Sequence, residues 1–251
     1  MESRLCTLIP WAGLLALDLI VPPIAASAQP ETFAVCQHGN TVGTASFTFV
    51  SKPAGRDSTS LVRVNMQGLN YALSKTEKLS PSNKLLHVQL SAIVNNSAVN
   101  IVAKPDAAQF LLNISANGRS NTTRLDGHKL TVFLPDFDPG ALETLLALAA
   151  TYDNRDLWAI IPKQAGSIEP IQLATYPDER GTLNGKPISV HHLVATISGA
   201  TTDLFSGPEN QLLQAELPQQ GFALVRNGFV LTPPSKPLAL PSAPATSAPA
   251  Q

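Results

Sequence analysis

Residues 85–94 read "LLHVQLSAIV", and their apolar side chains recur at every second position. One face of such a segment would hold Leu86, Val88, Leu90, Ala92 and Val94, and the other Leu85, His87, Gln89, Ser91 and Ile93. Successive side chains of a β-strand point to opposite faces, so this alternation predicts a strand. The same period of two appears at 61–66, 110–116 and 212–217, and the sequence therefore predicts a mainly β protein.

Short turn signals separate these predicted strands. They are Asn95-Asn96, Asn117-Gly118, Asp126-Gly127, Asn184-Gly185 and Asn227-Gly228. Asn, Asp and Gly tolerate the positive φ angles of tight hairpin turns, which predicts an antiparallel meander. Some strands are apolar on both faces, as in "LWAII" at 157–161. We therefore expect a strongly curved sheet, a half-barrel that wraps around a core.

One segment, "PDFDPGALETLLALAATYD", has the period of a helix instead. Asp138 is suited to cap a helix that begins at Pro139, and we expect the helix over about 138–150. Its apolar residues Leu142, Leu145, Leu146 and Ala149 follow the i, i+3, i+4, i+7 spacing. The helix is apolar nearly all round, so we expect it to be buried against the concave face of the sheet. Asp136 and Asp138 could alternatively belong to a cation loop, but no ladder of acidic residues follows them.

The first 28 residues have the pattern of a signal peptide. An apolar run from Leu8 to Ile20 precedes the small-residue sequence Ala26-Ser27-Ala28, after which we expect cleavage. An uncleaved anchor is the alternative, although Asp18 within the run disfavours it. We thus expect a periplasmic or secreted protein with one domain at 29–232 and no integral membrane segment after cleavage. The Pro-, Ala- and Ser-rich residues 233–251 are predicted to be a disordered tail.

Composition limits the partners. Charged residues make up 14% of the chain and the formal net charge is −1, so no nucleic acid partner is expected. Cys36 would be alone once Cys6 leaves with the signal peptide, which excludes an intrachain disulfide. We interpret Cys36 as a buried or idle thiol, with a disulfide between chains as the alternative.

The adjacent histidines His191 and His192 raise the question of a metal or catalytic site. They lie in a predicted strand at 188–197, where neighbouring side chains point to opposite faces and cannot bind one metal together. The chain lacks the G-x-S-x-G, H-E-x-x-H, C-x-x-C and nucleotide-binding motifs. We therefore expect no metal, no cofactor and no catalytic residue.

The C-terminal third resembles a known group. "GTLNGKPISVHHLVATISGA", followed by a strand with the Leu212-Leu213 pair and a hairpin, is similar to the closing half of exported proteins of the DUF3108 family. "NTVGTASFTF" at 40–49 resembles the opening strand of that family. The family is in turn similar to the LolA and LppX lipoprotein carriers, which implies a curved half-barrel with helices on its concave face. The resemblance carries over no functional residue, and residues 69–126 depart from the family's pattern.

Two functions of different classes follow. The first is a non-catalytic binding protein that holds a lipid or acyl group in an apolar cavity between sheet and helix. The residues expected to line it are Val88, Leu90, Phe110, Leu112, Leu142, Leu145, Leu146 and Trp158, which could instead fill a solid core. The alternative is a structural or assembly factor of the cell envelope that contacts a protein partner. A hydrolase using His191 or His192 with Asp203 or Ser206 is a third hypothesis.

Overall fold

The computed structural model describes residues 29–152, 156–163 and 165–233. The predicted signal peptide, and the predicted tail beyond Pro233, lie outside this part of the chain. The described residues form a 16-stranded sheet and one α-helix, α1, at Pro139–Thr151. The prediction of a mainly β, largely antiparallel protein is confirmed. In the described residues, α1 is too short to cross a membrane.

The first half of the sheet is a meander of eight strands in chain order. They are β1 (Glu31–Gln37), β2 (Asn40–Lys52), β3 (Gly55–Met66), β4 (Leu69–Leu79), β5 (Leu85–Val94), β6 (Ser97–Asp106), β7 (Gln109–Ala116) and β8 (Arg119–Asp126). Each strand pairs antiparallel with the next. The predicted turns at Asn95-Asn96 and Asn117-Gly118 have positive φ at both residues, as tight hairpins require.

The second half returns along the other edge of β1. Its strands are β9 (Leu130–Phe133), β10 (Leu157–Ile161), β11 (Ser167–Leu183), β12 (Lys186–Ile197), β13 (Ala200–Ser206), β14 (Leu212–Leu217), β15 (Phe222–Arg226) and β16 (Phe229–Thr232). A short 3-10 turn, η1, lies at Pro218–Gln220. The sheet order is β8-β7-β6-β5-β4-β3-β2-β1-β15-β14-β13-β12-β11-β10-β9, and β16 pairs with β11. The β9–β10 pair is parallel.

The two ends of this long sheet come close to each other. β9 lies against β5, and β11 lies near β8. The Thr123 hydroxyl on β8 donates to the carbonyl of Ala165 at 2.9 Å, which ties the end of the meander to the β10–β11 connection. The chain thus crosses over between β8 and β9. The prediction of a hairpin turn at Asp126-Gly127 was wrong, because these residues begin this crossover.

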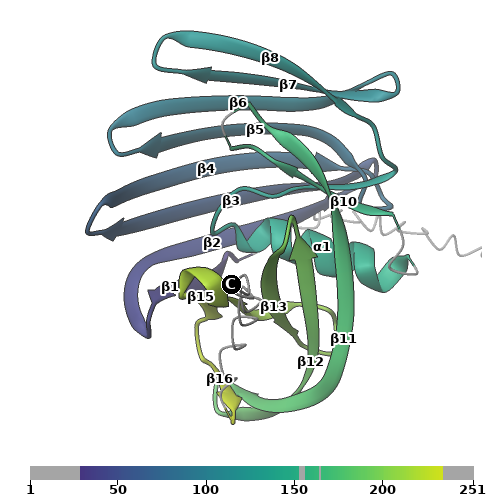
Figure 1. The fold of residues 1–251 in the computed structure, drawn as a ribbon. Helices are drawn as coiled ribbons and strands as arrows, with labels where there is room; N and C mark the ends of the chain where they lie inside the picture. Colours follow the sequence, from purple (N-terminus) through teal and green to yellow (C-terminus); the bar gives the residue numbers. More distant parts are fainter. Residues whose placement is uncertain (1–28, 153–155, 164, 234–251) are drawn as a thin grey trace, which may run out of the picture.

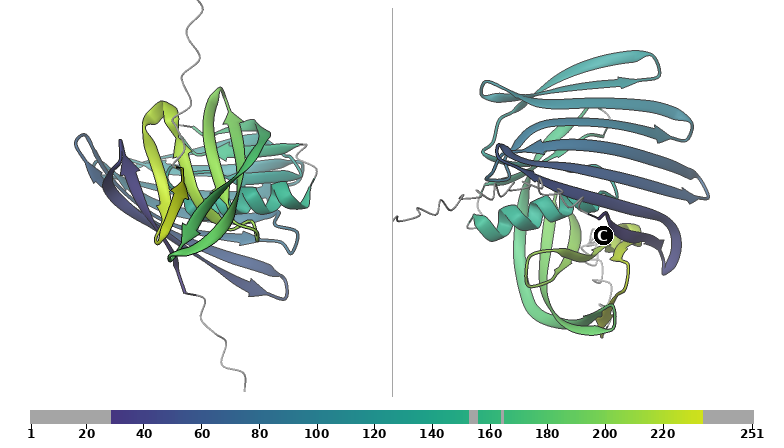
Figure 2. Two further views of the ribbon diagram at one scale, coloured as in Figure 1. Left: turned by 90° about the horizontal axis from the view of Figure 1, so that it is seen from below. Right: turned by 180° about the vertical axis from the view of Figure 1, so that it is seen from behind.

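Helix α1 lies between the meander and the strands of the second half (Figures 1 and 2). It packs against β2, β3, β9 and β14. Asp138 caps it as predicted, since its carboxylate accepts hydrogen bonds from the backbone N–H groups of Gly140 and Ala141. Its buried residues are Pro139, Gly140, Ala141, Leu142, Thr144, Leu145, Leu146 and Leu148.

The alternation of strand β5 is correct from Val88 to Val94 but reversed at its start. Leu85 is buried, whereas Leu86 is about half exposed. The register between β4 and β5 shifts between Lys78 and Leu79, so a bulge adds one residue to β5 at this point. A one-residue shift exchanges the two faces, and this local pairing cannot be read from the alternation alone.

Candidate functional site

The inner face of β4–β7 is lined by apolar side chains around a hollow of about 450 Å³, called here the larger hollow. Its walls are Leu69, Tyr71, Leu90, Ala92, Val94, Val99, Ile101, Ile114, Ala116, Pro135, Asp136, Phe137, Pro162 and Lys163. Because side chains alternate along each strand, four neighbouring strands present one continuous apolar wall. The volume lies in the range of small-molecule sites, roughly 300–1,000 Å³.

Polar groups gather at one side of this hollow. Lys163 Nζ lies 2.9 Å from Asp136 Oδ1, and both side chains are about half exposed. The Tyr71 hydroxyl donates to the backbone carbonyl of Asp136 at 3.3 Å. Burial raises the pKa of Tyr71, and the charges of Asp136 and Asp138 add to this effect, so that Tyr71 stays a neutral hydrogen-bond donor. The larger hollow therefore combines an apolar interior with a polar mouth.

Phe137 separates the larger hollow from a second one. Its ring lies edge-on to Tyr71 and to Phe222 on β15, with centroid distances of 6.0 and 4.9 Å. The second hollow, called the smaller hollow, has a volume of about 240 Å³. Its walls are Leu134, Pro135, Asp136, Phe137, Asp138, Leu142, Ile161, Lys163, Ser167, Glu169, Ile197, Ser198, Ala200, Thr202, Leu217, Gln220 and Leu224. Phe137 thus contributes to both.

A buried ion cluster holds the beginning of α1 on the sheet. Lys75 Nζ lies 3.0 Å from Glu77 Oε2 and 2.6 Å from Asp138 Oδ2, and all three side chains are fully buried. Lys75 and Glu77 are i, i+2 neighbours on β4 and so share its inner face. Asp138 belongs to the segment before α1. Its second oxygen caps the helix, so one carboxylate joins the helix to the strand.

The charges of this cluster depend on each other. Burial on its own lowers the pKa of Lys75, but the Asp138 and Glu77 carboxylates outweigh it, and the pKa lies above its ordinary value. Burial raises the pKa of Glu77, and the Lys75 ammonium offsets part of that rise. None of the three reaches solvent, so we assign them a structural role: they position α1.

A partly buried carboxyl, that of Glu143, lies further along the helix. Glu143 accepts a hydrogen bond from the backbone N–H of Leu212 at 2.9 Å, which links α1 to β14. Burial raises the pKa of Glu143, and the Leu212 N–H offsets part of the rise. The Arg56 guanidinium lies 3.9 Å above the ring of Phe49, and burial lowers the pKa of Arg56 despite the neighbouring carboxylates of Glu143 and Glu77.

The two histidines contact carboxylates on opposite faces of β12. His191 Nδ1 lies 3.0 Å from Asp178 Oδ1. On the other face of β12, His192 Nε2 lies 2.8 Å from Asp203 Oδ1 and its Nδ1 lies 3.4 Å from Glu179 Oε1. Asp178 and Glu179, both on β11, lie where the pairing with β12 shifts register between Tyr176 and Glu179. A carboxylate oxygen therefore lies close to each ring nitrogen of His192.

The geometry does not assemble the hydrolase site. The His192 ring stacks on Phe205 at 4.5 Å and is flanked by Tyr176 at 5.0 Å. Ser206 Oγ is buried and, among the residues that the structure describes, has no hydrogen-bond partner. A nucleophile needs a base within hydrogen-bond reach, and here Asp203 pairs with His192 without a serine. Within the described ranges, no group of three His, Cys, Asp or Glu side chains could hold a metal ion.

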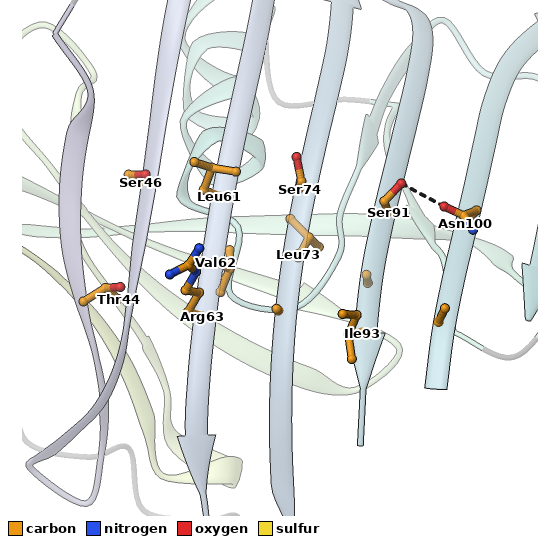
Figure 3. Close-up of a pocket in the computed structure, with 13 residues that line it drawn as sticks. Thr44, Ser46, Leu61, Val62, Arg63, Leu73, Ser74, Ser91, Ile93 and Asn100 are labelled. Atoms are coloured by element: carbon orange, nitrogen blue, oxygen red, sulfur yellow. Dashed lines mark hydrogen bonds between the residues drawn. The ribbon is translucent and has the colours of Figure 1, made fainter. Parts of the chain in front are cut away.

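The larger and smaller hollows both lie on the inner side of the sheet. A third hollow, whose volume of about 520 Å³ exceeds that of either, lies on the outer face of the meander (Figure 3). It is flanked by Leu61 on β3 and Ile93 on β5, which are 52% and 49% exposed. Ser91 donates to Asn100 Oδ1 at 2.8 Å across its floor. Most of its lining comes from outward side chains of adjacent strands, with the buried Val62, Leu73 and Ala92 beneath them. Polar and apolar groups are interspersed, so it is a surface depression.

The residues predicted to line a cavity lie in four different places. Leu90 lines the larger hollow, and Leu142 lines the smaller one. Val88, Phe110, Leu112, Leu145 and Leu146 are packed in the hydrophobic core, as the solid-core alternative expected. Trp158 is partly buried and stacks on the ring of His128 at 3.6 Å. Leu90 and Leu142 are thus the predicted residues that border open space.

Sequence reasoning missed the residues that shape the site. Lys75 and Glu77 interrupt the inward alternation of Tyr71, Leu73 and Leu79 on β4, and this interruption was a readable signal of a buried ion pair. Asp136, Phe137 and Lys163 carry no comparable signal. They lie in connections, and the tertiary fold alone brings 135–137 next to 162–163.

Comparison with known proteins places the chain in no family. No family model matches it, and no curated protein matches it. A crystal structure of a DUF1089 family protein from Pseudomonas aeruginosa matches with a TM-score of 0.39 and 12% sequence identity, over 84% of this chain and 95% of that one. The resemblance to the DUF3108 family and the lipoprotein carriers stays a prediction.

Proposed function

We propose that the protein is a non-catalytic, exported binding protein that holds an apolar ligand with an acyl or lipid chain. The observation that carries the proposal is the larger hollow, whose walls on β4–β7 are almost entirely apolar. We further propose that the sheet acts as a half-barrel and that α1 is the plug of its concave face. In this arrangement the helix fills the part over β2 and β3, and the ligand fills the part over β4–β7.

The energetics support an apolar chain in this hollow. Each methylene transferred from water gains about 0.8 kcal/mol, so ten methylenes would gain roughly 8 kcal/mol before the costs of association. A gain of about 8 kcal/mol corresponds to micromolar affinity before those costs, which are about 4 kcal/mol or more and bring the affinity of a ten-carbon chain toward the millimolar range. The Lys163–Asp136 ion pair lies at the solvent-facing side, where a chain would enter. The signal-peptide pattern of residues 1–28 supports a role outside the cytoplasm.

The decisive experiment compares two substitutions on neighbouring residues of β5. Ala92→Phe places a ring in the larger hollow, whereas Ile93→Phe points to the outer face. Binding of the uncharged fluorescent probe 1-anilinonaphthalene should fall at least tenfold in Ala92→Phe and stay unchanged in Ile93→Phe, with similar unfolding temperatures for both because the added ring of Ala92→Phe has open space to occupy. Native mass spectrometry of gently purified protein should also reveal a co-purified lipid. A wild-type protein that carries no lipid and ignores the probe would refute the proposal.

The outer-face depression supports a second candidate, an envelope assembly factor that contacts a protein partner. Leu61 and Ile93 are exposed apolar side chains on this face. Such residues, when grouped, are typical of protein contact surfaces. A Leu61→Glu/Ile93→Glu variant should lose a co-purified envelope protein if this function holds, while probe binding in the larger hollow stays the same.

A further inference from the structure

We propose that the larger and smaller hollows form one site for a single amphiphile, with its chain in the larger hollow and an uncharged, hydrogen-bonding head group in the smaller one. This inference rests on the proposed function and names the ligand class for it. The two hollows share Pro135, Asp136, Phe137 and Lys163 as wall residues, so they lie on either side of the same segment.

The conformation of Phe137 supports a movable partition. Its φ angle is +58°, in the left-handed region that bulky residues rarely adopt. Such strained positions recur at ligand clamps and switches. The ring contacts Tyr71 and Phe222 edge-on, and the residue is only partly buried. In the proposed site, rotation of the Phe137 side chain opens a passage beside Pro135, Asp136 and Lys163 between the spaces of about 450 and 240 Å³.

The chemistry of the two hollows differs in the way that an amphiphile requires. The larger hollow presents aliphatic side chains from four strands. The smaller hollow adds hydroxyl and amide groups, from Ser167, Ser198, Thr202 and Gln220. Hydroxyl and amide side chains can both donate and accept hydrogen bonds, so they suit the hydroxyl groups of a neutral head.

Charge selects against an anionic head group. The carboxylates at the smaller hollow belong to Asp136, Glu169 and Asp138, and its cation is Lys163. Asp138 shares Lys75 with Glu77, and Lys163 is already paired with Asp136. Glu169 leaves an excess of negative charge. An anionic head would have to enter against this charge, which disfavours fatty acids and phospholipids of net negative charge.

The test compares three ligands that share a twelve-carbon chain and differ in the charge of the head group. They are monolaurin, which is neutral, laurate, which is anionic, and dodecyltrimethylammonium, which is cationic. Their affinities for the full mature chain are measured at pH 7 by displacement of the uncharged fluorescent probe 1-anilinonaphthalene, below their critical micelle concentrations. We expect monolaurin to bind at least tenfold more tightly than laurate, whose charge Glu169 opposes. We expect it also to bind more tightly than dodecyltrimethylammonium, because that head attracts the carboxylates but cannot make the hydrogen bonds that Ser167, Thr202 and Gln220 offer. Equal affinities, or a preference for laurate or the ammonium, would overturn the inference while leaving the proposed function intact.

Two variants separate the head-group site from the chain site. Thr202→Val removes one hydroxyl of the smaller hollow and should weaken monolaurin binding roughly fivefold, without changing the affinity of the purely apolar probe 1-anilinonaphthalene. Thr59→Val, on the exposed outer face of β3, is the matched control and should change neither. Glu169→Gln should raise laurate affinity. Failure of every probe to bind wild type refutes the proposed function itself; a Thr202→Val protein that binds monolaurin normally refutes the head-group site.

Discussion

The inner face of the sheet differs between the part beneath α1 and the part beyond Phe137. Beneath α1, the buried side chains of the helix pack on β2 and β3, and the Lys75–Glu77–Asp138 cluster is sealed from solvent. Beyond Phe137, the strands β4–β7 continue, but the larger hollow takes the place of a helix. The two parts meet in three consecutive residues: Asp136 at the mouth, Phe137 at the partition and Asp138 in the buried cluster.

This difference shows how one connection serves two purposes. The helix can be held rigidly because Asp138 ties its N-terminus to β4 through Lys75. A rigid helix end in turn positions Asp136 and Phe137 at the rim of the hollow. Stability is thus concentrated on one side of the connection, and the open space for a ligand lies on the other. Substitutions on the stable side should therefore change the free energy of unfolding, and those in the hollow should change binding.

The largest expected effect comes from Lys75→Met. This change leaves Glu77 and Asp138 buried without their cation, which should lower the free energy of unfolding by about 3–5 kcal/mol. Chemical denaturation monitored by tryptophan fluorescence measures it. The Lys75→Met/Glu77→Leu variant should recover much of the loss, because it removes the unpaired charge on β4 as well. A loss below about 1 kcal/mol in the single variant would mean that the cluster does not stabilise the fold.

A smaller effect is expected for Gly140→Ala on the first turn of α1. A Cβ at this position would lie 2.7 Å from Ser60 Oγ and 3.1 Å from Phe47 Cβ. Overpacking of this kind costs about 1–3 kcal/mol, although alanine is the better helix former by about 1 kcal/mol. Thermal unfolding should show a net loss. Gly140→Ala/Ser60→Ala removes the closest contact and should restore part of it, whereas a stabilised single variant would contradict the tight packing of α1 on β3.

The smallest effect concerns Glu143, and it depends on pH. Its pKa in the folded protein is raised, so the folded state holds the proton more tightly than the unfolded chain does. The contribution of Glu143 to stability is therefore present at low pH and is lost as pH rises from about 4.5 through the raised pKa. Glu143→Gln keeps an acceptor for the Leu212 N–H but cannot ionise. Denaturation at pH 5 and pH 8 should show a smaller decrease for this variant than for wild type; equal decreases would count against a raised pKa.

The alternation of apolar residues in the sequence predicted side chains that fill the core, but it did not predict the larger hollow. Alternation predicted the inward faces of β3 and β7 and the residues Val88 and Leu112 that fill the core. The same alternation cannot say whether an inward side chain meets another side chain or open space. Leu90 and Leu112 occupy equivalent inward positions, yet Leu90 borders the larger hollow and Leu112 is fully buried. What covers each residue depends on distant segments.

The sequence by itself determined the strand periodicity, the hairpin turns at Asn-Asn and Asn-Gly, and the cap of α1 at Asp138, because each depends on residues within a few positions of each other. Only the tertiary structure decided where the sheet ends meet, that Lys75 pairs with Asp138, and that Phe137 stands between two hollows. These features join residues far apart in the chain. Their energies come from burial and charge pairing in three dimensions, which local patterns do not record.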